Sequence, residues 1–144
     1  MKSKCISVFV MLTALVSLVL GGVFVQQGFA KEAFLVSAMN QEEITVDGVE
    51  GIVDSAAEAQ IAGDLVREHR HGISPTYGDL LGGGRFDPTN PQQLSYAQAL
   101  NLENYLYLAV ASFGVFTVVK AVGAALVVIG LGLGVGGYGL FRRA

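Results

Sequence analysis

Tryptophan is absent from this 144-residue chain, cysteine occurs once and proline occurs three times. The single cysteine, Cys5, excludes a disulfide within the chain and any metal site built on several thiolates. The three prolines lie between residues 75 and 91, and all 12 acidic residues lie between residues 32 and 103. Both ends of the chain are therefore free of proline and of negative charge.

Charge is divided sharply along the chain. Residues 31–103 carry four basic and 12 acidic side chains, a net charge of −8. The five other basic residues have no acid beside them: Lys2, Lys4, Lys120, Arg142 and Arg143. An acidic middle disfavours contact with phosphates, so we predict no nucleic-acid partner.

The N-terminal segment has the length of a membrane span. Residues 5–25 carry no charge, and about 20 apolar residues cross a hydrocarbon core roughly 30 Å thick. Two lysines precede the run and predict a cytoplasmic N-terminus under the positive-inside rule. We assign residues 1–4 to the cytoplasm and residues 5–30 to a retained signal-anchor helix. A signal peptide cleaved after Ala30 is the alternative, although the apolar run exceeds the usual length of about 7–15 residues.

The C-terminal segment is also apolar. We predict one hydrophobic helix over 105–141, with its membrane span at about 121–141 between Lys120 and Arg142. These two residues would lie about 33 Å apart along a helix, which matches the thickness of a bilayer core. The predicted interface anchors are Lys120, Tyr138, Arg142 and Arg143.

The terminal charges predict an all-α, multi-pass protein of the plasma membrane. The N-terminus and residues 142–144 face the cytoplasm, and residues 31–104 form a small, mostly helical extracytoplasmic domain. The lipid bilayer is thus the first predicted partner.

Residues 32–53 are predicted to be irregular. A strand-like stretch at residues 43–46 ends in the turn signal Asp47-Gly48. Four residues are too few to form a sheet alone.

A capping box follows at Ser55 and Glu58, and it predicts a helix that ends near Arg70 with Gly72 as its stop. Its predicted apolar face, which would pack on the next helix or on a partner, consists of Ile61, Ala62, Leu65 and Val66.

Breakers then fill residues 72–90, until Asn90 caps a second helix. Pro91 takes its first position and Gln93 supplies the third-position partner. This helix is predicted to continue from Pro91 into the membrane as one rod.

Two histidines, His69 and His71, are weak metal candidates. They flank Arg70, and a spacing of two on a helix points the rings apart, whereas helical zinc sites use a spacing of four. We predict no metal site and no cofactor.

Glycines recur in the C-terminal helix at four-residue spacing, in the pairs Gly130/Gly134 and Gly132/Gly136. Such pairs let two membrane helices approach closely, and they predict a homo- or hetero-oligomer formed through this helix. Ser17 and Gly21 form a weaker pair of the same kind, so packing of the first segment on this helix is the alternative. Residues 134–139 also match GxGxxG, but an apolar span offers no strand before it and no water for a nucleotide.

Three short segments and the end of the chain share a layout with a known group of proteins: residues 43–46, 56–60 and 76–80 and the apolar tail closed by Arg142 and Arg143. In this layout the chain resembles small actinobacterial two-span membrane proteins, which are often named aromatic ring-opening dioxygenase subunits. The resemblance implies two spans and a short exported middle. A ring-opening dioxygenase needs an iron site of histidines and a carboxylate, which these segments do not supply.

The leading functional hypothesis is a non-enzymatic accessory or scaffold subunit of a cell-envelope complex. Two alternatives stay open. One is a metal- or redox-dependent enzyme subunit that uses His69 and His71, and the other is a small transport or sensor component that uses Lys120.

Overall fold

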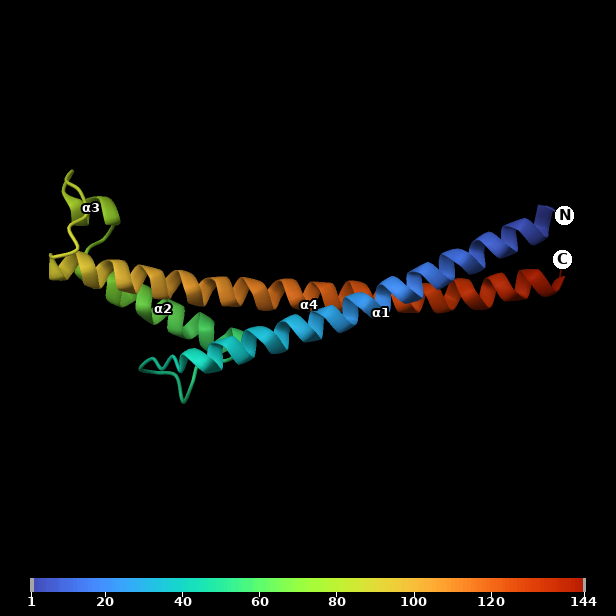
Figure 1. The fold of residues 1–144 in the computed structure, drawn as a ribbon, viewed down its shortest axis with the longest axis horizontal. Helices are drawn as coiled ribbons and strands as arrows, with labels where there is room; N and C mark the ends of the chain where they lie inside the picture. Colours follow the sequence, from blue (N-terminus) through green and yellow to red (C-terminus); the bar gives the residue numbers. More distant parts are fainter. Residues whose placement is uncertain (1, 144) are drawn as a thin grey trace. The chain divides into compact units, whose positions relative to one another are not determined.

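The computed structural model describes residues 2–143, and every regular element in this range is an α-helix. Four helices follow one another: α1 (Lys2–Glu42), α2 (Ala56–Ile73), α3 (Tyr77–Leu81) and α4 (Pro91–Arg143) (Figure 1). The predicted all-helical fold is confirmed, and so is the single helix that begins at Pro91 and continues to the C-terminal arginines. By length and composition, both α1 and α4 could cross a membrane.

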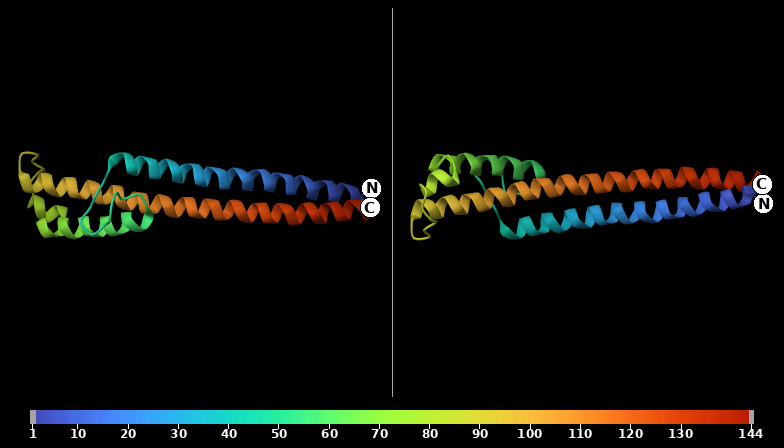
Figure 2. Two further views of the ribbon diagram at one scale, coloured as in Figure 1. Left: turned by 90° about the horizontal axis from the view of Figure 1, so that it is seen from below. Right: turned by 90° about the horizontal axis from the view of Figure 1, so that it is seen from above.

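Two compact units divide the chain. The hairpin unit comprises residues 1–33 and 114–144, and the middle unit comprises residues 34–113. In the hairpin unit α1 and α4 run antiparallel, so that the start of α1 and the end of α4 lie side by side (Figure 2). In the middle unit α2 lies along the first turns of α4 (Figure 1).

Small residues at intervals of seven form the contact between the two helices of the hairpin unit. The buried positions among its described side chains are Ser7, Ala14, Gly21 and Gly28 of α1 and Gly123, Gly130 and Gly137 of α4. A seven-residue period keeps one face of each helix against its partner, as in left-handed helix pairs. We call this row of positions the glycine seam.

Backbone meets backbone at the centre of the glycine seam. A Cβ added at Gly21 would lie 2.7 Å from the carbonyl oxygen of Gly123, and one added at Gly123 would lie 2.8 Å from the carbonyl oxygen of Gly21. At Gly130 the nearest atom to such a Cβ is Leu18 Cγ, at 2.8 Å. Small residues permit this approach of two helices, and a side chain here would force them apart.

Apolar side chains from α1, α2, α4 and the loop after α1 form the core of the middle unit. The buried members of this core are Met39, Val53, Ala59, Ala62, Leu106, Ala109 and Phe113. Of the residues predicted to form the apolar face of α2, Ala62 is buried and Val66 is partly buried, whereas Ile61 is 50% exposed. The contact face of α2 is carried by small residues, because α2 approaches α4 closely there.

Residues 32–42 are helical, and the prediction of an irregular segment there was wrong. They contain no glycine or proline, and Leu35, Val36 and Met39 recur at helical spacing and pack in the core. The strand-like stretch at 43–46 is also not a strand. Its carbonyl groups accept from the N–H of Val53 at Ile44 and from the N–H of Val49 at Val46, and these bonds belong to a turn and a loop rather than to a sheet. The turn at Gly48 is confirmed, with φ at +90°.

Both predicted helix starts are confirmed. The Ser55 hydroxyl accepts from the N–H of Glu58, while the Glu58 carboxylate accepts from the N–H of Ser55. Asn90 accepts from the N–H groups of residues 92 and 93, but Gln93 accepts from the N–H of Asp87 rather than from the cap residue. The predicted end of α2 was three residues early, because Gly72 lies inside the last turn and the helix ends at Ile73, where Pro75 disfavours further helix.

Replacing Ser55 with alanine is expected to lower the free energy of unfolding by about 1 kcal/mol at pH 7. The Ser55 hydroxyl is the main cause that lowers the pKa of Glu58 below its ordinary 4.5. The stability gained from the ionised Glu58 carboxylate is present above about pH 4.5, and it is lost as the pH falls through the lowered pKa of Glu58 in the folded state. Guanidinium unfolding between pH 3 and 7 should therefore show a smaller acid loss in Ser55→Ala than in the parent. Ser95→Ala, at an exposed position of α4, should leave both the stability and its pH dependence unchanged.

Candidate functional site

A buried ion pair joins α2 to α4 in the middle unit. Arg70 Nε donates to Glu103 Oε2 at 2.6 Å, and Arg70 Nη2 donates to Glu103 Oε1 at 3.4 Å. Arg70 Nη1 donates to the hydroxyl of Tyr96. Arg70 and Glu103 are only 8% and 6% exposed, so the guanidinium is held from two sides away from water. This fork geometry fixes the position of α2 along α4.

Two tyrosine rings lie beside this cluster. The Arg70 guanidinium lies 5.0 Å from the centre of the Tyr96 ring, which in turn lies 6.0 Å from the ring of Tyr77. The hydrogen bonds with Glu103 raise the pKa of Arg70, so this side chain stays charged in every accessible condition. The cluster therefore holds a permanent positive charge between α2 and α4.

A second polar contact lies further along the same two helices. The Tyr107 hydroxyl donates to Asp64 Oδ1 at 2.7 Å, and Arg67 pairs with the same oxygen at 3.1 Å. Burial raises the pKa of Tyr107, while hydrogen bonds from Gln60 and Tyr107 lower that of Asp64. The Tyr107 ring covers Gly63, where an added Cβ would lie 3.0 Å from the ring. Both polar contacts thus hold α2 against α4. We call the Arg70–Glu103–Tyr96 contact and the Asp64–Tyr107 contact the polar clasps.

The two histidines face different surroundings. His71 Nε2 lies 3.1 Å from Arg70 Nη2, whereas His69 lines a shallow groove. Among the described residues, no group of three or more His, Cys, Asp or Glu side chains gathers as metal ligands would. The structure therefore does not bring His69 and His71 together with a carboxylate in one site.

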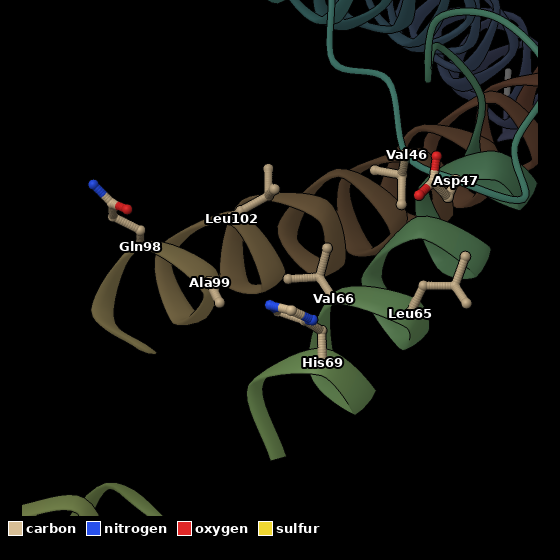
Figure 3. Close-up of a pocket in the computed structure, with 8 residues that line it drawn as sticks. All are labelled: Val46, Asp47, Leu65, Val66, His69, Gln98, Ala99 and Leu102. Atoms are coloured by element: carbon tan, nitrogen blue, oxygen red, sulfur yellow. The ribbon is translucent and has the colours of Figure 1, made fainter. Parts of the chain in front are cut away.

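The groove beside His69 has a volume of about 440 Å³ and a mainly apolar lining. The loop after α1 contributes Val46 and Asp47 to it (Figure 3). Helices α2 and α4 contribute Leu65, Val66, His69, Gln98, Ala99 and Leu102. This volume lies in the range of ligand pockets, with a few polar groups around an apolar floor.

Lys120 has an acidic partner within the hairpin unit. Its Nζ donates to Glu32 Oε2 at 2.6 Å and lies 4.8 Å from the centre of the Phe29 ring. The Lys120 stem crosses Gly28, where an added Cβ would lie 2.5 Å from Lys120 Cγ. The charge that interrupts the apolar run of α4 is therefore matched by a charge on α1.

The four glycines predicted to pack fall on different faces of α4. Gly130 belongs to the glycine seam, and Gly134 makes an ordinary contact, with an added Cβ 3.9 Å from Ala14 Cβ. Gly132 and Gly136 have open space where a side chain would point. Their packing against another molecule stays a prediction, as do the anchoring roles of Arg142, Arg143 and Tyr138. Arg142 lies 6.0 Å from the Tyr138 ring centre.

Sequence reasoning identified Gly130 as a packing residue, but it missed the polar clasps and the seven-residue interval of the glycine seam. Arg70 and Glu103 lie 33 positions apart, and no local pattern relates them. The glycine seam does have a signal in the sequence, which is the exact seven-residue interval between its members.

Comparison with protein-family models, with curated proteins and with solved structures finds no match to this chain. The resemblance to small actinobacterial two-span proteins therefore stays a prediction.

Proposed function

We propose that this chain is a non-catalytic accessory or scaffold subunit of a cell-envelope complex. Its hairpin unit would be a transmembrane helix pair, and its middle unit would be an acidic domain presented outside the cytoplasm. The observation that carries the proposal is that charged residues lie at both ends of the hairpin unit. At each end, the charged residues of α1 and those of α4 lie at the same level along the helix axes.

The glycine seam sets these levels. It places Gly137 against Met11 and Lys120 against Gly28, so the register of the two helices is known along the whole contact. Lys4 then lies toward the level of the C-terminal arginines, while Glu32 and Lys120 mark the other end. About 22 residues separate Lys120 from Arg142, a helix length of about 33 Å, which suits one bilayer core.

The side chains between these levels suit lipid. Large apolar groups on the outside of both helices are exposed, among them Phe9, Val16, Val128 and Val135. In water such a surface would be an aggregation hazard, whereas in a bilayer it faces hydrocarbon. The basic residues at the termini favour the cytoplasm for both ends, and the acidic middle unit then faces outward.

A retained first segment fits this arrangement better than a cleaved one. The predicted cleavage point after Ala30 falls inside the continuous helix α1. Every α1 member of the glycine seam lies before this point, and so does Phe29 beside Lys120. Cleavage there would remove the partner against which α4 packs, so we propose a signal-anchor.

A scaffold role is supported by what the polar groups do. The clasps around Arg70 and Tyr107 join helices, and their charged groups are already paired with one another. The open face at Gly132 and Gly136 supplies a surface for another helix, of a second copy or of a different subunit. Purification in mild detergent as a partner-free monomer would contradict this part of the proposal.

Labelling with a membrane-impermeant maleimide tests the topology. Cys5 is exposed in the structure and should react only after cells are permeabilised, because it would lie at the cytoplasmic end. In a Cys5→Ser background, Glu50→Cys should react in intact cells. The opposite pattern would invert the topology, and release of the chain from membranes by alkaline carbonate would remove the membrane assignment.

A further inference from the structure

The groove beside His69 lies next to a second hollow of the middle unit. That hollow, of about 470 Å³, shares Gln98 and Leu102 with the groove and adds Glu42, Ile44, Asn101 and Tyr105. The two hollows meet at Gln98 and Leu102 of α4 and are open to the outside. Apolar side chains predominate in the first, whereas the second is lined mainly by polar ones. A broad, open surface with an apolar part beside a polar one suits the side of an amphipathic polypeptide segment more than a small molecule, which would be enclosed more fully.

Acidic groups are placed at both parts of this surface. Asp47 lines the first part and Glu42 the second, and both residues are exposed. The middle unit as a whole carries eleven acidic and three basic side chains and no lysine. Two of the three arginines, Arg67 and Arg70, are already paired with Asp64 and Glu103. A cationic partner would therefore meet a complementary field.

We propose that this extended groove binds a cationic amphipathic helix of a partner protein. The apolar face of that helix would lie over Val66, Ala99 and Leu102, and its lysine or arginine side chains would reach Glu42 and Asp47. The inference rests on the proposed scaffold function, since it names the kind of subunit that the middle unit would hold. Helices of this type dock through residues spaced by three and four, which an open groove along α4 accommodates.

A binding titration with the full-length protein tests the proposal. The protein is placed in nanodiscs of zwitterionic lipid, and a fluorescein-labelled helical peptide of leucine and lysine, with leucine on one face, is titrated by anisotropy. Saturable binding above that of empty nanodiscs is expected. The matched leucine–glutamate peptide should bind at least about tenfold more weakly, because its charges oppose those of the groove.

Two double variants with the same change in net charge locate the site. Glu42→Lys/Asp47→Lys should weaken binding by about tenfold or more, while Glu50→Lys/Glu68→Lys, whose residues do not line the groove, should change it by less than about threefold. Leu65→Gln, on the apolar floor, should also weaken binding. Equal losses in the two double variants would show general electrostatic attraction and overturn the proposal, as would the absence of saturable binding.

The maleimide experiment separates this inference from the proposed function. If the middle unit proves cytoplasmic while groove binding follows the variants, the topology fails and the groove assignment stands. If the topology holds and the two double variants behave alike, the groove assignment fails alone.

Discussion

Replacement of Arg70 by alanine is expected to lower the free energy of unfolding of the middle unit by about 3–5 kcal/mol, because it leaves a buried charge without its partner. The carboxylate of Glu103 would remain enclosed, at 6% exposure, and the Tyr96 hydroxyl would lose its donor. Guanidinium unfolding in detergent micelles, followed by tyrosine fluorescence, measures the effect. Four of the five tyrosines lie in the middle unit, so the signal reports mainly on that unit.

Two further variants distinguish a buried pair from a simple loss of positive charge. Arg70→Met/Glu103→Leu should recover most of the stability, because no charge is then left unpaired in the interior. Arg67→Ala removes an arginine from the same helix, but that side chain is 50% exposed, and its loss should cost less than about 1 kcal/mol. If Arg70→Ala and Arg67→Ala were equally mild, the ion pair would not hold α2 on α4.

Substitution of leucine for Gly123 is expected to separate the two helices of the hairpin unit. A side chain at this position would enter the space held by the backbone of Gly21 and Val25, whose atoms lie 2.8 Å from an added Cβ. Because backbone cannot rotate away as a side chain can, the cost should reach about 3 kcal/mol or more. The expected result is a looser helix pair with intact helical content.

Disulfide crosslinking measures this separation directly. A Cβ at position 134 would lie 3.9 Å from Ala14 Cβ, a spacing that suits a disulfide. Ala14→Cys/Gly134→Cys, in a Cys5→Ser background, should therefore crosslink readily under mild oxidation. Adding Gly123→Leu should slow crosslinking by at least about tenfold, since each 1.4 kcal/mol corresponds to a factor of ten.

Gly132→Leu is the matched control, because the same residue change is made on the face of α4 with open space. It should leave crosslinking within the chain unchanged. If Gly132→Leu slowed the reaction as much as Gly123→Leu, the glycine seam would not be the contact that holds the pair. If it instead altered only the size of the detergent-solubilised particle, the open face would be the one that meets another molecule.

Local features of this fold could be predicted from the sequence. The Ser55/Glu58 capping box acts over three residues, and so does the Asn90 cap, so both are visible wherever the helix begins. The long helix from Pro91 was predictable because no strong breaker follows before the glycine-rich apolar stretch. Helix α1 was predicted to end too early, because an acidic segment after an apolar one resembles a loop, although Leu35, Val36 and Met39 keep helical spacing.

Contacts between distant residues could not be predicted in the same way. Nothing near Arg70 in the sequence shows that Glu103 and Tyr96 will face it, since these partners meet only once α2 and α4 are packed. The same holds for Lys120, whose partner Glu32 lies 88 positions away. The glycines were recognised as packing residues, but which of them faces α1 depends on the register of the two helices. That register is fixed by tertiary contact.

The glycine seam has a consequence for how the proposed membrane hairpin would respond to bilayer thickness. A single helix that is too long or too short for the surrounding lipid adjusts by tilting on its own. Here the backbones of α1 and α4 touch at Gly21 and Gly123, so neither helix can tilt without carrying the other. The two helices would tilt together as one rigid body, and the Lys120–Glu32 ion pair would move with them relative to the headgroups.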